Sequence, residues 1–450
     1  MQLRAKPDLM PFAGLPDSVQ IIRREAEYRQ QRRRARADGG QRPGKSADMA
    51  MAPPTAAKTV GNDIARTPLQ QEIRRDALAD LALRYRVAAS TSTPFVERLV
   101  HFWSNHFAIS IDKNSARLLA APMEREAIRP HVLGDFADLL AAVETHPGML
   151  LDLDNAASIG DDSMLAQRIE RRDAKRKLGL NENLAREILE LHTLGVDGGY
   201  AQQDVVELAK AITGWGTPLR RDAQNPAASA FVFRPGAHEP GARSVLGKRY
   251  KEAGEAQGHA ILRDLAVHPA TARHLSLKLA RHFVADVPPT ALVDRMATAF
   301  LRSNGSLPAL YRAMIDDDAA WSADARKFKT PEDFVISAMR AGAMRIDHRP
   351  LVLIRLLQQL GQPTFTPRSP AGFPDTAADW ASGDALRKRM QASGMLAEQL
   401  ATARKPVELA ADVLGVDAVE GPLAELLRRA GSPQEGFAML FCSPAFQWRV

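Results

Sequence analysis

The sequence predicts an all-α protein, a large multi-helical single body with long irregular loops and few or no strands. Apolar residues recur near every 3.6 positions in most segments after Pro68, as in helices that bury one side. Helix-start signals accompany this period: Thr330 offers a capping hydroxyl, Pro331 suits the first turn, and two acids follow. Extended patterns are scarce, and residues 229–234 form the clearest one.

The chain divides into a basic N-terminal part and a long helical part. We expect residues 1–62 to form an Arg-rich helix over 15–36 and then a flexible linker, and residues 63–450 to form the helical domain. The stretches 216–258 and 361–380 are rich in Gly and Pro, and long irregular loops of this kind often carry function. The predicted helices of the domain are 68–88, 94–108, 123–144, 182–194, 202–214, 269–284, 290–302, 331–343, 350–360, 383–401, 406–413, 421–430 and 433–442.

Charge and cysteine content limit the partners of the protein. Residues 1–45 carry most of the net charge of +7, so the body is nearly neutral and nucleic-acid binding by a basic groove is disfavoured. The Arg-rich helix is either a solvated helix face or, as a weaker alternative, a contact for nucleic acid or acidic lipid. The single cysteine, Cys442, excludes a disulfide framework within the chain and is expected to be a small core residue.

No membrane span is expected, because no run approaches the roughly 18 apolar residues that a span needs. The first 36 residues also lack the apolar stretch of a secretory signal. We therefore expect a cytoplasmic protein if translation starts at Met1, and a periplasmic or otherwise exported protein if the true start lies upstream.

The helix predicted from Glu182 has an apolar side and a charged side. Leu184, Ile188 and Leu191 lie in the apolar arc. The charged side is either a solvated surface or a carboxylate cluster for acid–base chemistry or for a hard cation. Arg186 is four residues from both Glu182 and Glu190, so it can bridge their two carboxylates. Glu187 and Glu190 are spaced i, i+3, which brings these two carboxylates close together. The residues on this side are Glu182, Asn183, Arg186, Glu187 and Glu190.

Two further helices carry charged or histidine side chains at helical spacing. On the helix over 94–107, His106 falls within an aromatic arc and is expected to be a hydrogen-bonded core histidine, or else a ligand or base. On the helix from Pro269, a basic stripe is either solvated or a cationic wall that holds an anionic substrate. The stripe consists of His274, Lys278 and Arg281. Zinc-helix, P-loop, dinucleotide and serine-elbow motifs are missing from the sequence, so it assigns no cofactor and no metal.

Six motifs occur in a fixed order along residues 68–450. They are Trp103-Ser-Asn-His-Phe107, Asn181-Glu-Asn-Leu-Ala-Arg-Glu-Ile-Leu-Glu-Leu-His-Thr-Leu-Gly195, Thr213-Gly-Trp215, His268-Pro-Ala-Thr-Ala-Arg273, Lys327-Phe-Lys-Thr-Pro331 and Ser443-Pro-Ala-Phe-Gln447. Together they resemble the bacterial family called domain of unknown function 1800. The long string from Asn181 is specific to that family, and the other motifs support it jointly.

The resemblance implies a mostly helical fold, frequent export, and a gene often found beside a member of another uncharacterised family. That neighbour family is similar to the alkaline-phosphatase and sulfatase superfamily. The resemblance implies no activity. This chain departs from the family where His192 replaces a second aromatic, where His238-Glu239 replaces His-Asp, and where Gly372-Phe373 replaces Gly-Trp.

The helix faces and the motifs together define a predicted cleft. Glu187 or Glu190 would transfer a proton or hold a cation, Arg186 would orient the carboxylate, and His106 is a further catalytic candidate. Arg273 would meet an anionic group of the substrate. The predicted substrate-binding residues are Asn105, Asn183, Trp215, His238 and Arg273.

Two functions stay open at this level. The first is an enzyme, exported if translation starts upstream, whose cleft is lined by carboxylate, Arg and His side chains and has the capacity to bind a metal of unspecified identity. The alternative is a non-catalytic accessory or scaffold protein that acts with the phosphatase/sulfatase-like neighbour. In that case the same polar residues form a structural network that holds the helices in register.

Overall fold

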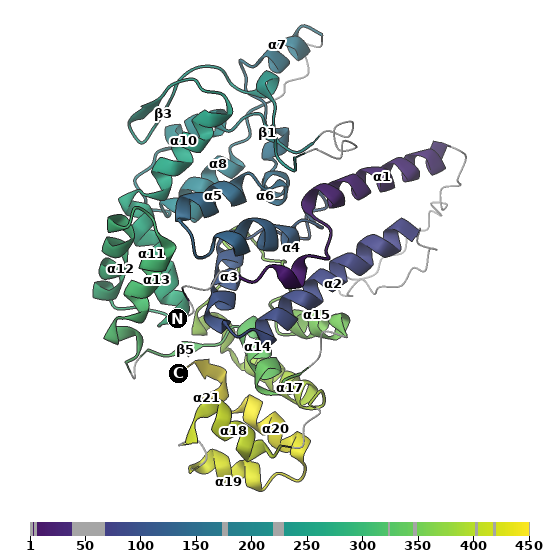
Figure 1. Ribbon diagram of the computed structural model, residues 1–450, viewed down its shortest axis with the longest axis vertical. Helices are drawn as coiled ribbons and strands as arrows, with labels where there is room; N and C mark the ends of the chain where they lie inside the picture. Colours follow the sequence, from purple (N-terminus) through teal and green to yellow (C-terminus); the bar gives the residue numbers. More distant parts are fainter. Residues whose placement is uncertain are drawn as a thin grey trace, which may run out of the picture.

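The computed structural model describes residues 3, 7–37, 68–172, 179–218, 229–322, 325–344, 349–400, 404–416 and 420–449. Helices dominate these residues and the strands form only short pairs, which confirms the predicted all-α class. The helices are stacked along the long axis of the molecule, with the C-terminal helices gathered at one end (Figure 1). None of the described helices is long and apolar enough to cross a membrane.

The larger hydrophobic core is built from the part of the chain between residues 94 and 315. Trp103, Phe136, Leu189, Leu279 and Phe300 are fully buried in it. The helices of this part are α3 (Pro94–His106), α4 (Ala120–Met123), the π-helix η3 (Glu124–Ile128), η4 (Arg129–His131), α5 (Phe136–Glu144), α6 (Pro147–Asp152), η5 (Asn155–Ala157), α7 (Met164–Glu170), α8 (Asn183–Glu187), the π-helix η6 (Ile188–Thr193), α9 (Gln202–Ala211), η7 (Pro235–Ala237), α10 (Glu255–Ala266), α11 (Pro269–Phe283), α12 (Thr290–Arg302) and α13 (Leu307–Ile315).

A second core lies towards the C-terminal end and includes Tyr85, Phe334, Leu357 and Phe446. Thr330 caps its first C-terminal helix, because the hydroxyl accepts a hydrogen bond from the Asp333 backbone N–H, as the sequence predicts. The helices around this core are α2 (Pro68–Ser90), α14 (Pro331–Ala341), α15 (Pro350–Gln359), α16 (Ala377–Trp380), α17 (Gly383–Ala397), α18 (Pro406–Leu414), α19 (Pro422–Arg428), α20 (Pro433–Cys442) and α21 (Pro444–Gln447); the short helix η8 (Asp318–Ala320) lies between α13 and α14 in the sequence.

Three two-stranded antiparallel pairs complete the described structure. β1 (Trp215–Gly216) pairs with β2 (Val232–Phe233), which lies in the stretch predicted as extended. β3 (Arg243–Val245) pairs with β4 (Lys248–Tyr250). β5 (Lys327–Phe328) pairs with β6 (Trp448–Arg449), so the end of the chain returns to the start of the second core. This last pair positions the site described below.

The Arg-rich N-terminal helix is present as α1 (Ser18–Ala37), after the short helix η2 (Met10–Phe12). It runs beside α2, and both project from the body (Figure 1). Arg24 on α1 donates to Asp76 on α2 at 2.7 Å. The linker predicted to follow, residues 38–62, lies outside the described residues.

Two predicted helices are interrupted in the structure. The segment 123–144 is broken into α4, η3, η4 and α5, because Pro130 lacks a backbone N–H and its ring clashes with the preceding turn. The segment 182–194 starts as α8 but continues as the π-helix η6. A π-turn inserts a residue into the helical period, which a search for a period of 3.6 does not detect.

Both long stretches predicted to be irregular are partly helical. Helix α16 lies inside the predicted loop 361–380, and helix α10 begins at Glu255, inside the predicted loop 216–258. Gly258 lies within helix α10, where it allows close packing rather than a loop. A Cβ at this position would lie 2.5 Å from a ring carbon of Trp215. The absence of a side chain lets α10 approach the buried indole.

Candidate functional site

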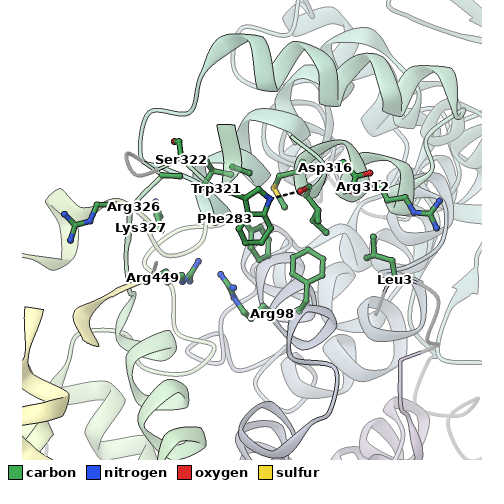
Figure 2. A pocket seen from close by; sticks show the side chains of 16 residues that line it. Leu3, Arg98, Phe283, Arg312, Asp316, Trp321, Ser322, Arg326, Lys327 and Arg449 are labelled. Atoms are coloured by element: carbon green, nitrogen blue, oxygen red, sulfur yellow. Dashed lines mark hydrogen bonds between the residues drawn. The ribbon is translucent and has the colours of Figure 1, made fainter. Parts of the chain in front are cut away.

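Two adjoining cavities lie where the two cores meet. The outer cavity, of about 1100 Å³, lies between α3, α11, α13 and the β5–β6 pair. The inner cavity, of about 160 Å³, lies between α3, α14 and the loop of residues 361–376. Arg98 and Arg449 line both cavities. Figure 2 shows their side-chain ends near the ring of Phe283 in the outer cavity.

Arg98 is a half-buried cation on α3 with an unusual environment. Its guanidinium lies over the Phe283 ring, 4.8 Å from the ring centre. Its Nη2 atom is buried and has no hydrogen-bond partner among the described residues. Burial lowers the pKa of Arg98 to about 9, the charge of Arg449 acts in the same direction, and Asp333 opposes both. A buried nitrogen donor without a partner costs free energy unless something accepts from it.

Arg449 and Lys327 face each other across the β5–β6 pair. Arg449 donates to the His282 carbonyl oxygen at 2.8 Å and forms an ion pair with Asp333. Lys327 is buried and lies 2.6 Å from an oxygen of Asp286. Each of these two cations therefore has its own carboxylate, whereas Arg98 has none among the described residues.

The titration of neighbouring groups reflects a positive local potential. Burial opposes ionisation of Asp333, but Arg449 and His282 outweigh it and hold the pKa of this carboxyl well below its usual range. Burial also holds the pKa of the His282 imidazole well below its ordinary value. Arg449, Arg98 and Lys327 add to that effect, and Asp333 opposes it.

The far wall of the inner cavity is a rigid network of ion pairs. Glu97 accepts two hydrogen bonds from Arg129, at 2.6 and 2.5 Å, and both side chains are buried. Arg84 pairs with Glu332, and His101 Nδ1 lies 3.3 Å from the other oxygen of Glu332. Burial raises the pKa of Glu332, but Arg84 and His101 outweigh burial and hold it well below its usual range.

The loop of residues 361–376 covers the inner cavity. The Asn105 side chain donates to the Phe373 carbonyl oxygen at 2.9 Å and accepts from the Phe373 N–H at 2.8 Å, which ties the loop to α3. Gly372 has φ +84°, and a Cβ there would lie 2.3 Å from the Asn105 carbonyl oxygen. Asp375, on the same loop, lies 3.8 Å from His282. Burial raises the pKa of Asp375, and Lys327 opposes that rise.

Of the predicted site residues, Asn105 lines the inner cavity, and the others line neither cavity. His106 is buried, and its Nε2 lies 3.1 Å from the His192 carbonyl oxygen. Burial holds the pKa of His106 well below its ordinary value, and Lys278 acts in the same direction. His192 in turn contacts Glu144 at 2.8 Å in the fully buried core. The structure therefore places His106 within a core histidine network.

The predicted carboxylate cluster lies around α8 and η6. Burial raises the pKa of Glu187, His192 lowers it, and Glu190 raises it further. Arg186 donates to Glu182 at 3.0 Å and to the Gln202 side chain at 2.9 Å. Glu190 accepts a hydrogen bond from the Tyr200 hydroxyl at 3.3 Å. All three carboxylates of the group are half-buried, burial raises the pKa of Glu187, and the catalytic role of Glu187 stays a prediction.

The four remaining predicted residues lie apart from the two cavities. Asn183 is exposed at the start of α8, and Arg273 forms an exposed ion pair with Asp294 on α12. Trp215 is fully buried and its ring centre lies 4.8 Å from that of His259. The Nδ1 atom of His238 lies 3.0 Å from the Thr213 carbonyl oxygen. Their roles in substrate binding stay predictions.

The predicted basic stripe on α11 is half-buried rather than solvated. His274 Nε2 lies 3.1 Å from the Leu191 carbonyl oxygen, so this side of α11 contacts η6. Burial lowers the pKa of His274 to about 4, and Lys278 acts in the same direction. Burial also lowers the pKa of Lys278 to about 8, Asp375 opposes this, and Arg281 supports it.

Sequence reasoning did not select the charged residues that line the cavities, although signals for some of them were present. Arg98 is three residues after Phe95 and four before Phe102, so it lies at the edge of an aromatic arc. Lys327 opens one of the six motifs, and Asp333 belongs to the helix start at Thr330. Their convergence depends on the β5–β6 pairing, which has no local sequence signal.

Metal binding was part of the predicted enzyme function. Among the residues that the structure describes, no group of three or more His, Cys, Asp or Glu side chains is placed to hold a metal ion. The charged groups of the two cavities instead form arginine–carboxylate and lysine–carboxylate pairs.

A family model described as "Protein of unknown function (DUF1800)" matches residues 3–448. The match therefore includes the Arg-rich helix α1 as well as both cores. No curated protein and no solved structure matches the chain. The function has to be inferred from the geometry of the chain itself.

Proposed function

The chain belongs to the DUF1800 family, and we propose that it binds a small organic anion at Arg98 and Arg449. The observation that carries this proposal is the buried Nη2 atom of Arg98, which has no partner among the described residues. A carboxylate or phosphate oxygen would accept from it and remove the cost of leaving it unpaired. Arginine suits this role because its planar fork binds such groups in a bidentate manner.

The charge balance at the outer cavity supports the same proposal. Arg449 and Lys327 are each neutralised by a carboxylate, whereas Arg98, Arg312 and Arg326 line this cavity together with a single carboxylate, that of Asp316. An anion would supply the missing negative charge at a site that is partly removed from water, where ionic interactions are stronger. Burial lowers the pKa of Arg98, and the charge of Arg449 acts in the same direction, as expected for a cation without a carboxylate of its own.

An enzymatic function for the same cleft is supported by the geometry of His101. Its Nδ1 lies 3.3 Å from a Glu332 carboxylate oxygen, which can only accept a hydrogen bond. The Nε2 atom is buried, has no hydrogen-bond partner among the described residues and lies 3.8 Å from an oxygen of Glu97. A histidine oriented by a carboxylate, with no hydrogen bond at its second nitrogen, has the geometry of a proton-transfer residue. We propose His101 as the proton-transfer residue for the bound anion.

The alternative proposal is an accessory protein that acts with a phosphatase/sulfatase-like neighbour. It is supported by the internal pairing of the predicted polar residues, such as Asn105 with Phe373 and His106 with the His192 carbonyl. A co-purification experiment with that neighbour tests it. Loss of the complex in variants of these pairs, with the anion site left intact, would favour the accessory function over the anion-binding one.

Calorimetric titration with benzoate tests the anion site. We expect wild-type protein to bind benzoate and Arg98→Met to bind it at least about tenfold more weakly, because methionine keeps the contact with Phe283 but not the charge. The control is Arg326→Met. Arg326 also lines the outer cavity but is exposed and lies over Trp448, 5.3 Å from that ring centre. It extends away from the cavity (Figure 2), so its loss should leave the affinity unchanged.

The outcomes of this titration separate the possibilities. Equal affinity in wild type and Arg98→Met, or no binding by a folded wild type, would overturn the anion site. His101→Gln should bind benzoate as the wild type does, because its proposed role is proton transfer. Hydrolysis of p-nitrophenyl phosphate, sulfate and acetate provides the activity readout, and turnover that survives in His101→Gln would exclude His101 as the base.

A further inference from the structure

The outer cavity combines a cationic end with apolar walls. Arg98, Arg449 and Lys327 lie at its inner end, where it adjoins the inner cavity. The walls are largely aromatic and aliphatic, and the Phe95 and Phe283 rings pack with their centres 5.3 Å apart. The apolar walls also include Val284, Met314, Ile315 and Ala320. An anion that filled only the cationic end would leave these walls unused.

Trp321 supports an apolar ligand in the outer cavity. This residue is 72% exposed, and it is the only aromatic residue among the exposed large hydrophobic residues of the described chain. The indole N–H donates to the Ile315 carbonyl oxygen at 2.7 Å, which holds the ring in place beside the cavity (Figure 2). An exposed indole whose polar atom is already satisfied presents an apolar surface to a ligand.

We propose that the ligand class of this site is an amphiphilic anion, a carboxylic or phosphoric acid with an extended alkyl body. The acid group would lie at Arg98 and Arg449, and the alkyl body would lie along Phe283 towards Trp321. This inference rests on the proposed anion site and adds the apolar part of the ligand. The volume of about 1100 Å³ is at the upper end of small-molecule sites, so it accommodates more than a short acid.

Charged residues near the opening are consistent with this orientation. Arg312 and Asp316 line the outer cavity and are exposed, so both remain hydrated when an alkyl chain enters. The buried cations lie only at the inner end, where Arg449 is held by Asp333 and by the His282 carbonyl. Charge complementarity therefore orients the acid group inward and leaves the alkyl body against the aromatic walls.

A chain-length series tests the proposal by calorimetry. Hexanoate, octanoate and decanoate are titrated below the concentrations at which they form micelles. We expect about a fourfold gain in affinity per added methylene, which is on the order of a hundredfold from hexanoate to decanoate. Decyl phosphate, compared with decanoate, shows which acid group the site prefers. Decanol is the uncharged control ligand, and wild type should bind it more weakly than decanoate. Because decanol carries no charge, wild type and Arg98→Met should bind it with equal affinity.

A matched pair of substitutions tests where the alkyl body lies. Ala320 lines the outer cavity, whereas its neighbour Ala319, on the same short helix η8, does not. Ala320→Phe should reduce decanoate affinity at least tenfold and leave benzoate binding unchanged. Ala319→Phe should change neither affinity, and thermal unfolding of both variants establishes that they are folded.

Failure of this inference is distinguishable from failure of the anion site. Benzoate binding that depends on Arg98, with no gain along the chain-length series, would overturn the amphiphile proposal and leave the anion site intact. The anion site would instead be overturned, leaving only an apolar cavity, if decanol and decanoate bound with equal affinity and if Arg98→Met changed neither affinity.

Discussion

Arg449 lies directly opposite Lys327 in the antiparallel pairing of β5 with β6. Like charges at opposed positions destabilise a strand pair. Here each cation is neutralised by a different carboxylate, because Asp333 pairs with Arg449 and Asp286 pairs with Lys327. The β5–β6 strand pair therefore brings two cations to the cavities without leaving their repulsion uncompensated. Arg98 is the third cation, and it has no carboxylate of its own among the described residues.

Removing the carboxylate of Asp333 should destabilise the protein. Asp333→Asn leaves Arg449 without its partner beside Arg98, and we expect a loss of about 2–4 kcal/mol in the free energy of unfolding at pH 7, measured by urea denaturation. Asp294→Asn, which breaks the exposed pair with Arg273, should cost less than about 1 kcal/mol. Equal effects of the two substitutions would contradict the special role of Asp333.

The effect of Asp333→Asn should depend on pH in a defined direction. The folded pKa of Asp333 is lower than its unfolded value, because Arg449 and His282 outweigh burial. Its stabilising contribution is thus complete above the unfolded pKa of about 3.9 and is lost as the pH falls through the folded pKa. The difference between wild type and variant should therefore narrow below about pH 4. A constant difference from pH 7 to pH 2 would contradict this.

Substitution of Gly372 should loosen the loop that covers the inner cavity. Gly372→Ala combines a positive φ with a Cβ 2.3 Å from the Asn105 carbonyl oxygen. We expect it to lower the free energy of unfolding by about 2–3 kcal/mol. Gly415→Ala is the control, because Gly415 also has positive φ, at +91°, but no atom of the described residues lies within 4 Å of the position that a Cβ would take. It should cost only about 1 kcal/mol, and an equal cost would show that the contact with Asn105 is not tight.

The pKa of Lys278 should respond in opposite directions to its two charged neighbours. Burial lowers it to about 8, Asp375 raises it, and Arg281 lowers it. Asp375→Asn should therefore lower the pKa further, and Arg281→Met should raise it. The measurement is an NMR titration of the lysine Cε signals, assigned with Lys278→Met. Shifts in the same direction in both variants would rule out this electrostatic environment.

The low pKa of Lys278 also has a consequence for stability. A lysine whose folded pKa is below its unfolded value stabilises the fold fully above the unfolded pKa, and this contribution is lost as the pH falls through the folded value. The window runs from the ordinary lysine pKa of 10.5 down to about 8. The stability of Lys278→Met relative to wild type should therefore increase as the pH falls from 10.5 to below about 8.

Glu187 and Glu144 should respond differently to loss of charge. Burial raises the pKa of Glu187, so its stabilising contribution is present below its unfolded pKa and is lost as the pH rises through the folded value. Glu187→Gln should thus be as stable as wild type or more stable at pH 7, with unchanged helicity by circular dichroism. Glu144→Gln disturbs the fully buried contact with His192 and should be clearly less stable. Unfolding of Glu187→Gln would show that Glu187 has a structural role instead of the proposed catalytic one.

Local sequence signals were sufficient where the chain interacts with its own neighbours. The cap at Thr330, the Arg-rich helix α1 and the aromatic arc of α3 all follow from residues within a few positions of one another. The buried state of His106 was also predictable, because Phe102 and Trp103 share its side of the helix. The helix break at Pro130 also has a local cause. It was not predicted, because the apolar residues on both sides of Pro130 follow one helical period.

The cavities, by contrast, depend on contacts between distant parts of the chain. Arg98, Asp333 and Arg449 meet only because β6 pairs with β5 and because α3 packs between the two cores. Two-residue strands have too little periodicity to be recognised, and ion pairing over more than 100 residues leaves no pattern in a single sequence. The sequence by itself determined the helices and their apolar sides. Only the tertiary structure decided which charged side chains are neutralised and which one, Arg98, has no carboxylate partner among the described residues, because that depends on distances in space.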